Sequence, residues 1–366
     1  MKENKKTNKP KIMLHYVKPG SLGGPNILYK RIESSTELQG KYNFVPLNQD
    51  LLAGGKINIK LILKLKKLIK KEAPDIIIIS GMQSTGFHCM IAAILAGCKN
   101  RIITTHGFSG DDLGLSNIKR FVFNSLIEPL TLLLATRVQG ISKYTIEKPM
   151  VRKYGKNKTS FIYNFPPSKE ETSKEVYVRK ELGIGNEEVV FTTVSRVVFD
   201  KGYKELSEAI EKLKEVENIR FLIVGEGKYE ETFKRLVKEE IQNKKVIMLG
   251  KRTDVMNILK ESDVFVLPTL HENLGNVFLE ASAVKIPSIG TRVGGVPEII
   301  IPGETGFLVP PFDSEKLAAV MLKLFNDSSL RKTLGEKAYV RLKTVFNPKD
   351  IEKQFDELFV KLLKEN

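Results

Sequence analysis

Two cations follow a short apolar run in the second half of the chain. Arg196 and Lys201 lie in Ser195–Gly202, between a β-branched run and a segment of helical spacing that begins near Tyr203. A helix N-terminus attracts anions, because it carries a positive dipole end and backbone N–H groups without partners. Two fixed cations beside it suit a diphosphate, although a solvated basic turn would have the same sequence. The pattern therefore predicts a phosphate-binding turn, with a plain surface turn as the alternative.

Two carboxylates flank a glycine turn further along the chain. Glu272 and Glu280 are separated by seven residues within the stretch Pro268–Glu280. We expect Glu272 in a loop that leaves a strand and Glu280 two turns into the following helix. One carboxylate can accept hydrogen bonds from two vicinal hydroxyls, and the amides of residues 274–277 can hold sugar oxygens or phosphate. The stretch therefore predicts a binding site for a sugar or a nucleotide.

The elements that must position these residues are short β-branched runs that alternate with segments of helical spacing. Continuous apolar strands that alternate with helices indicate parallel sheets covered on both faces. The expected strands are Ile12–Val17, Asp75–Ser80, Arg101–Thr105, Arg137–Ser142, Thr159–Tyr163, Val189–Ser195, Arg220–Val224, Val246–Leu249, Asp263–Leu267 and Ser288–Gly290.

The alternation is interrupted once, in a stretch with two prolines and no apolar periodicity, Asn164–Glu175. We predict a first domain over 1–165, a linker over 166–176 and a second domain over 177–349. The helix expected over 350–366 belongs to the second domain or crosses back to the first. The predicted fold class is α/β, with two Rossmann-like doubly wound domains that face each other across a ligand-binding cleft.

The second half resembles the donor-binding domain of the GT-B glycosyltransferases, in the large retaining group called family 4. The resemblance spans about 150 residues and rests on motifs in a fixed order: Ser195–Gly202, Val224–Gly227, Leu249–Arg252, His271–Ala281, Pro287, Gly294–Glu298 and Gly303–Leu308. The first half is consistent with it, because glycines follow the first strand (Gly20–Gly24) and a His-Gly pair follows another (Thr105–Gly107).

The resemblance implies a role for each matching residue. Arg196 and Lys201 would neutralise the diphosphate of a nucleotide-sugar, and Glu280 would accept the ribose hydroxyls. Glu272 would hold the hexose, and His106 would face the transferred sugar. The candidate catalytic residues are His106, Glu272, Arg196 and Lys201. The candidate donor-binding residues are Gly23, Gly24, Arg196, Lys201, Gly225, Lys251, Arg252, Asn273, Leu274, Gly275, Asn276, Val277 and Glu280.

Two positions depart from the family pattern. Glu272-Asn273-Leu274 stands where Glu-Gly-Phe is usual, and Tyr163–Phe165 stands where many members have Pro-Asn-Gly. Asp111-Asp112 is not the Asp-x-Asp arrangement of metal-dependent glycosyltransferases, so we expect no metal and no cofactor, with a UDP- or GDP-sugar as donor. The resemblance alone implies retention of configuration. Because no carboxylate is assignable as nucleophile, we expect front-face substitution assisted by the leaving phosphate.

The net charge of +16 lies in the first half, where residues 1–165 hold 27 Lys and Arg against 10 Asp and Glu. The basic residues concentrate in Lys56–Lys71, whose leucines form a stripe that suits core packing. The lysine face suits an anionic membrane or plain solvent; it comprises Lys60, Lys64, Lys67 and Lys71. We expect this face to attach the protein to the inner leaflet of the cell membrane, near a lipid-linked glycan acceptor.

Single features of the sequence are also compatible with three other functions. A nucleotide-sugar epimerase of the same two-domain build stays open as the alternative. A short-chain dehydrogenase is suggested by Tyr144 and Lys148, which match Tyr-x3-Lys, but the first strand is not followed by G-x-G-x-x-G. A nucleic-acid-binding protein is disfavoured, because 46 of the 59 basic residues are Lys and there is no Trp. We therefore expect a glycosyltransferase of polysaccharide biosynthesis without a nucleic-acid partner.

The remaining features favour a cytoplasmic protein. Cys89 and Cys98 are too few for a disulfide scaffold and are expected to be buried thiols. Met1–Lys11 lacks the apolar core of a signal peptide. The apolar runs Leu130–Ala135 and Ile76–Ile79 have the length of core segments and fall far short of a membrane span.

Overall fold

The computed structural model describes residues 9–19, 23–50, 56–111, 115–168 and 177–365. Part of the predicted glycine loop (Gly20), of the Asp111-Asp112 pair (Asp112) and of the linker (169–176) lies outside them. The chain divides into two compact units. Unit 1 comprises Met1–Phe165 and Pro348–Asn366, and unit 2 comprises Pro166–Asn347. Within the described residues, no helix combines the length and apolar character needed to cross a bilayer.

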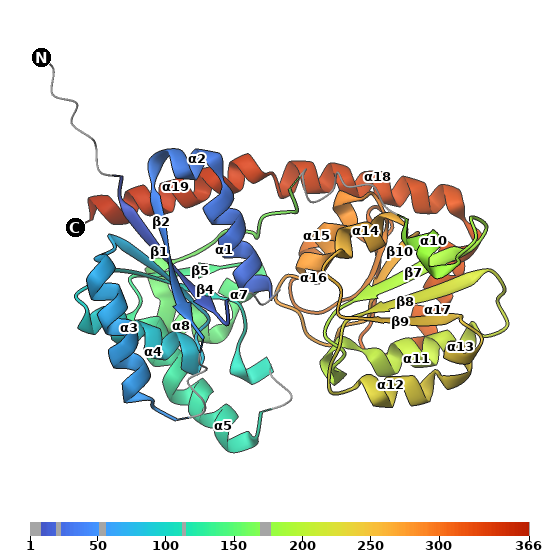
Figure 1. The fold of residues 1–366 in the computed structure, drawn as a ribbon, viewed down its shortest axis with the longest axis horizontal. Helices are drawn as coiled ribbons and strands as arrows, with labels where there is room; N and C mark the ends of the chain where they lie inside the picture. Colours follow the sequence, from blue (N-terminus) through green and yellow to red (C-terminus); the bar gives the residue numbers. More distant parts are fainter. Residues whose placement is uncertain (1–8, 20–22, 51–55, 112–114, 169–176, 366) are drawn as a thin grey trace, which may run out of the picture. The chain divides into compact units, whose positions relative to one another are not determined.

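Unit 1 contains a six-stranded parallel sheet (Figure 1). Its strands are arranged in the order β2-β1-β3-β4-β5-β6. Its strands are β1 (Lys11–Val17), β2 (Asn43–Gln49), β3 (Ile76–Ser80), β4 (Asn100–Thr105), β5 (Arg137–Gly140) and β6 (Thr159–Phe161). Strand β2 was not predicted. It is an edge strand that contains Pro46, and a proline within a run is tolerated only where the missing N–H has no ladder partner.

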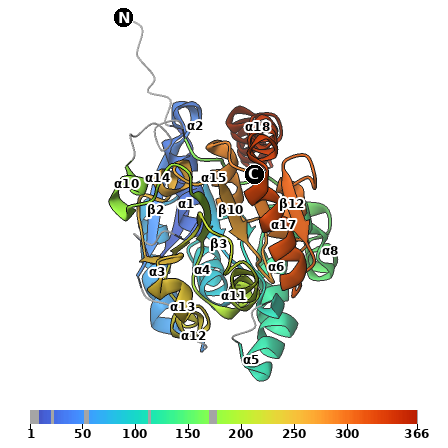
Figure 2. The ribbon, with the colours of Figure 1, turned by 90° about the vertical axis from the view of Figure 1, so that its right-hand side faces the viewer.

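Helices cover both faces of this sheet. One layer contains α3 (Ile59–Glu72), α4 (Ser84–Leu95), α6 (Glu128–Leu134) and α8 (Pro149–Gly155), each in contact with the next, and their labels follow this order from left to right in Figure 2. Before α6 come α5 (Asn117–Val122) and a π-helical turn, η2 (Phe123–Ile127). The other elements are α1 (Gly24–Ser34), α2 (Thr36–Lys41), η1 (Ser109–Asp111), α7 (Lys143–Glu147) and η3 (Lys156–Lys158).

The last helix of the chain, α19 (Pro348–Lys364), packs on unit 1. The Phe355 ring stacks on Phe165 with 6.0 Å between centroids, and Phe359 meets the Tyr42 ring edge-on at 5.2 Å. The Asp356 carboxylate accepts a hydrogen bond from the Tyr42 hydroxyl at 2.6 Å. The C-terminal helix therefore completes the core of the first half of the chain.

Unit 2 contains a second six-stranded parallel sheet, in the order β12-β11-β10-β7-β8-β9. Its strands are β7 (Val189–Val194), β8 (Ile219–Val224), β9 (Val246–Gly250), β10 (Val264–Leu267), β11 (Ser288–Thr291) and β12 (Gly306–Val309). The unpredicted β12 is a four-residue edge strand that begins at a glycine of a turn. With both sheets parallel and covered by helices, the predicted α/β doubly wound fold class is confirmed.

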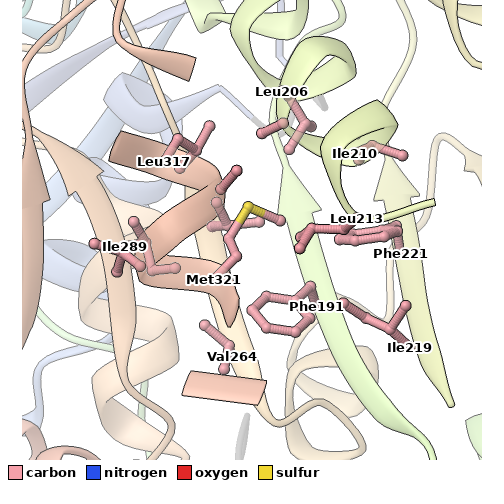
Figure 3. Packing of buried hydrophobic residues seen from close by; sticks show 14 of the residues in the cluster. Phe191, Leu206, Ile210, Leu213, Ile219, Phe221, Val264, Ile289, Leu317 and Met321 are labelled. Atoms are coloured by element: carbon pink, nitrogen blue, oxygen red, sulfur yellow. The ribbon is translucent and has the colours of Figure 1, made fainter. Parts of the chain in front are cut away.

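The core of unit 2 lies between its sheet and the helices α11 (Tyr203–Lys212) and α17 (Ser314–Asn326). Figure 3 shows Leu206 and Met321 from these helices among Phe191 and Phe221 from neighbouring strands. The remaining helices are α10 (Val178–Leu182), η4 (Phe199–Lys201), α12 (Glu230–Leu236), α13 (Lys238–Gln242), α14 (Val255–Lys260), α15 (Asn276–Ala283), α16 (Val296–Ile299) and α18 (Ser328–Val345).

Candidate active site

The predicted phosphate-binding turn follows β7 at the carboxyl edge of the unit 2 sheet. It forms η4 and ends at Gly202, whose φ of +73° is available to glycine at no steric cost. A Cβ atom on Gly202 would stand 1.8 Å from the Pro268 carbonyl oxygen, so the turn lies against the loop that follows β10. Arg196 lies exposed on this turn, and Lys201 is its last η4 residue.

Lys201 and Glu272, which the sequence assigned separately to phosphate and to sugar, are in direct contact. The Lys201 Nζ atom donates to Glu272 Oε2 at 2.6 Å and to the His271 carbonyl oxygen at 3.1 Å. Their side chains are 12 % and 22 % exposed, so the pair is largely but not completely shielded from solvent. Such a pair gains more Coulomb energy than a fully solvated one, and it remains accessible to a competing anion.

Two glycines, Gly294 and Gly295, pack against the backbone of the Glu272 loop. A Cβ atom on Gly294 would stand 1.6 Å from the Glu272 carbonyl oxygen, and one on Gly295 would stand 2.3 Å from that of Asn273. The Gly295 N–H donates to the Glu272 carbonyl oxygen at 3.1 Å. The sequence singled out this glycine pair as a motif but did not show which loop it supports.

The predicted sugar-binding residues continue from this loop into α15. Asn273 and Leu274 are buried, Gly275 adopts a φ of +92° as the N-cap, and the helix begins at Asn276. A side chain at Gly275 would be strained, and its Cβ atom would meet the Phe278 ring at 2.6 Å. Val277 lies in the first turn and Glu280 in the second, both half-buried. The loop and the helix start therefore form one segment that presents amides and carboxylates together.

Gly225 joins the ends of three strands at the same edge. Its N–H donates to the Gly250 carbonyl oxygen at 2.7 Å, and a Cβ atom on Gly225 would stand 1.8 Å from the Ser195 carbonyl oxygen. With a φ of +135°, the position is restricted to glycine in practice. Gly225 therefore supports the start of the predicted phosphate-binding turn.

Two of the predicted donor-binding residues, Lys251 and Arg252, follow β9. Arg252 forms ion pairs with Asp254 at 2.7 Å and Glu181 at 3.0 Å, and hydrogen bonds to these carboxylates raise its pKa. Lys251 is exposed, and its backbone N–H donates to Glu226 Oε1 at 3.4 Å. The Arg252 side chain is thus engaged with acidic residues of its own unit.

A cavity of about 390 Å³ opens at the carboxyl edge of the unit 1 sheet. Its lining includes His106, Gly23 at the N-cap of α1, and two polar side chains that the sequence did not single out, Lys18 and Gln83. Gly24 is the first residue of α1. The structure therefore brings His106 and the α1 N-terminus to one cavity.

His106 is an uncharged imidazole in this cavity. Burial lowers its pKa to about 3, and the Nε2 atom is shielded from solvent. Its ring meets that of Tyr29 edge-on at 6.0 Å. A neutral imidazole can donate or accept a hydrogen bond, but it supplies no fixed charge.

The segment after His106 is fixed by two later side chains, one from α6 and one from the residue between α7 and α8. The Ser109 N–H donates to Glu128 Oε1 at 2.7 Å, and Lys148 pairs with Asp111. The Lys148 ammonium also lies 4.8 Å from the ring centroid of Tyr144. Tyr144 and Lys148, which form the Tyr-x3-Lys match, are thus in contact with each other, and Lys148 also holds Asp111.

Among the side chains that the structure describes, no three His, Cys, Asp or Glu gather closely enough to hold a metal ion. The chemistry that the described site can supply consists of cations, backbone amides, carboxylates and a neutral imidazole.

Family models and relatives agree with this architecture. Residues 177–341 match the model "Glycosyl transferases group 1", and residues 30–133 match "Glycosyl transferase 4-like". The chain is 28 % identical over 332 residues to the capsular polysaccharide biosynthesis glycosyltransferase CapM of Staphylococcus aureus. The aligned region covers 88 % of this chain and 85 % of CapM. It is 28 % identical over 317 residues to the N-acetyl-alpha-D-glucosaminyl L-malate synthase of Bacillus anthracis, with coverage of 84 % and 80 %.

Solved structures share the fold over nearly the whole chain. Sucrose-phosphate synthase of Thermosynechococcus elongatus superimposes with a TM-score of 0.80 at 21 % identity, covering 98 % of this chain and all of that one. Anabaena HepE in complex with UDP-glucose gives 0.74 at 19 % identity, with coverage of 96 % and 99 %. These comparisons do not favour the epimerase alternative, because the relatives are named as transferases and synthases of this group. The chain belongs to the GT-B glycosyltransferases of the family 4-like group.

Proposed function

We propose that the protein transfers a sugar from a nucleoside diphosphate to a glycan acceptor in the biosynthesis of a cell-surface polysaccharide. The observation that carries the donor assignment is the Lys201–Glu272 pair at the carboxyl edge of the unit 2 sheet, beside the start of α15. A cation, a carboxylate and helix-terminal amides are what a diphosphate and a sugar need together. In support, Anabaena HepE, which shares the fold, has been solved with UDP-glucose.

The ion pair suggests how the donor is received. A diphosphate brings more negative charge than one carboxylate, so it competes with Glu272 for the Lys201 ammonium. The displaced carboxylate can then accept hydrogen bonds from hydroxyls of the sugar. Arg196 lies exposed on the same turn and adds a second cation. We assign the ribose hydroxyls to Glu280 and the base to the backbone around Lys251 and Arg252.

The reaction that fits these groups is a front-face substitution with retention and without a metal. The bond between the anomeric carbon and the phosphate oxygen breaks, and the acceptor oxygen bonds to the same face of that carbon. The acceptor's hydroxyl proton passes to the departing phosphate, so atoms and charge balance. Lys201 and Arg196 stabilise the charge that develops on the nucleoside diphosphate. His106 contributes a hydrogen bond to the transferred sugar, since its imidazole is neutral.

The acceptor that we propose is carried on a lipid. One relative, 29 % identical over 284 residues, is the UDP-Gal:alpha-D-GlcNAc-diphosphoundecaprenol alpha-1,3-galactosyltransferase of Escherichia coli. The lysine face of α3 is exposed, as a peripheral attachment to the inner face of the cell membrane requires. The excess of positive charge in residues 1–165 favours an anionic surface.

Donor binding is tested by thermal shift with UDP, GDP, ADP and their sugars, because a ligand that binds only the folded state raises its apparent stability. We expect one nucleotide to stabilise the wild type. Lys201→Met and Glu272→Gln should each weaken this effect and lower transfer roughly tenfold to a thousandfold. The matched control is Lys204→Met on α11, since Lys204 forms an exposed pair with Glu208. Stabilisation by no nucleotide, or normal transfer by both site variants, would refute the assignment.

A further inference from the structure

The rod formed by α5, η2 and α6 turns an apolar stripe to solvent. Its exposed side chains recur three or four residues apart, as on one side of a helix. We call them the apolar stripe: Ile118, Phe121, Val122, Leu126, Leu130 and Leu133. Ile118 is 79 % exposed and Phe121 is 69 % exposed. Polar residues of the same rod, Glu128 and Thr131, are fully buried. The rod also buries Leu132 in the core of unit 1, so its apolar residues lie both on the buried side and on the side that faces solvent.

Basic residues border the apolar stripe. Lys119 lies on α5 itself, and the neighbouring α8 exposes Arg152 and Lys153. On the other side, α4 carries no charged residue, and beyond it α3 exposes its lysine face. Within the ranges of α3, α4, α5, η2, α6 and α8, the acidic residues are Glu72 and the buried Glu128. The surface thus has an apolar centre and a basic rim.

The apolar centre and the basic rim together indicate which kind of partner binds this surface. A second copy of the chain would bring a unit with the same excess of Lys and Arg against this surface, and the two would repel each other. An anionic bilayer has the opposite charge, and it attracts each Lys or Arg that lies near its surface. Apolar side chains insert at the boundary between its headgroups and acyl chains, where they are removed from water. Exposed apolar patches with polar rims mark such contacts.

We infer that the apolar stripe inserts into the interface of an anionic membrane while the basic rim contacts its headgroups. The inference rests on the proposed function, because the membrane would carry the lipid-linked acceptor. It changes the emphasis of the sequence-based expectation, in which the lysine face of α3 made the contact alone. Here the apolar side chains anchor the protein, and the lysines select the lipid charge.

The test is flotation of the full chain with vesicles of phosphatidylcholine, with and without phosphatidylglycerol. The test variant replaces Ile118, Phe121, Leu126 and Leu130 by Gln, which favours helices and removes the apolar groups. We expect the wild type to float with the anionic vesicles and this variant to lose at least tenfold in binding. The matched control replaces the exposed Leu236 and Val340 of unit 2, which are 49 % and 59 % exposed, by Gln; it should bind as the wild type does.

Three outcomes would overturn the inference. The four-Gln variant could bind vesicles as well as the wild type, the wild type could fail to bind anionic vesicles, or the wild type could be a dimer that this variant dissociates. Circular dichroism and the thermal midpoint confirm that the variant is folded. Donor stabilisation measured without vesicles separates the two proposals. If it persists while flotation fails, the membrane inference is wrong and the donor assignment stands; if the nucleotide effect is missing in the wild type, the donor assignment is wrong.

Discussion

Replacing Gly294 by alanine tests whether the glycine pair positions the Glu272 loop. The added Cβ atom would stand 1.6 Å from the Glu272 carbonyl oxygen, where ordinary contacts begin at 3.4 Å. The loop must therefore move by nearly 2 Å, and it would carry the Glu272 side chain away from Lys201. A misplacement of about 1 Å costs roughly 100-fold in rate, so we expect transfer to fall at least 100-fold.

The same substitution also strains the backbone, because Gly294 has a φ of +56°. A left-handed conformation costs an alanine about 1–2 kcal/mol, which lowers the thermal midpoint of a unit this size by roughly 2–8 °C. Gly183 provides the matched control, since it lies in the same unit with a φ of +66° and a Cβ atom there would meet nothing within 4 Å. Gly183→Ala should lose similar stability and keep normal transfer.

The assay compares transfer rates and nucleotide-induced thermal shifts of the two variants with those of the wild type. Equal transfer rates of Gly294→Ala and Gly183→Ala would refute the reasoning. They would mean that the structure accommodates the added Cβ atom without displacing the Glu272 side chain. The thermal midpoints of both variants are measured first, so that unfolding of Gly294→Ala is not mistaken for a displaced Glu272 loop.

Three further predictions concern buried groups of unit 1. Burial lowers the pKa of His15 to about 4 and that of His106 to about 3, whereas the unfolded chain binds these protons near pH 6.5. The free energy of unfolding should therefore be highest above pH 6.5 and decrease as the pH drops towards 4. Urea titrations at successive pH values should show a smaller decrease for His15→Gln than for the wild type. Cys89 and Cys98 are buried thiols whose pKa values are raised by burial, so a thiol reagent should label them only after unfolding; labelling of the native protein would contradict the packing. Phe359 is fully buried, and Phe359→Ala should cost about 3–5 kcal/mol of unfolding free energy, measured by urea titration; a loss under 1 kcal/mol would show that α19 does not contribute to the core.

Most strands of the two sheets could be predicted from the sequence, because the inner strands are buried on both faces and are continuously apolar. Ile76–Ser80 is the plainest case, with every residue buried. Two of the four edge strands, β2 and β12, lack this signal, whereas the edge strands β6 and β9 were predicted. β2 contains a proline and alternates exposed and buried residues, and β12 is only four residues long with two of them half-buried. The proline and the exposed residues of β2, and the short length of β12, make these two runs resemble loops in the sequence.

The elements of the candidate site were predicted for a similar reason, and their contacts were not. The turn at Lys201 and the loop at Glu272 each follow a strand in a recognisable pattern, but they are 71 residues apart. Their ion pair depends on β7 and β10 being neighbours in the sheet, which only the topology shows. The run Leu130–Ala135 illustrates the converse, because its length suggested a core segment while Leu130 and Leu133 are exposed.

The return of the chain to unit 1 at α19 has a consequence for biosynthesis. A ribosome releases residues in order, so unit 2 is complete before Pro348 emerges, whereas unit 1 still lacks its last helix. Until then, Tyr42 and Phe165 have no α19 rings to pack against. We therefore expect the half of the protein that is made first to finish folding last, and a released chain truncated after Asn347 to be cut by protease in residues 1–165 while unit 2 resists.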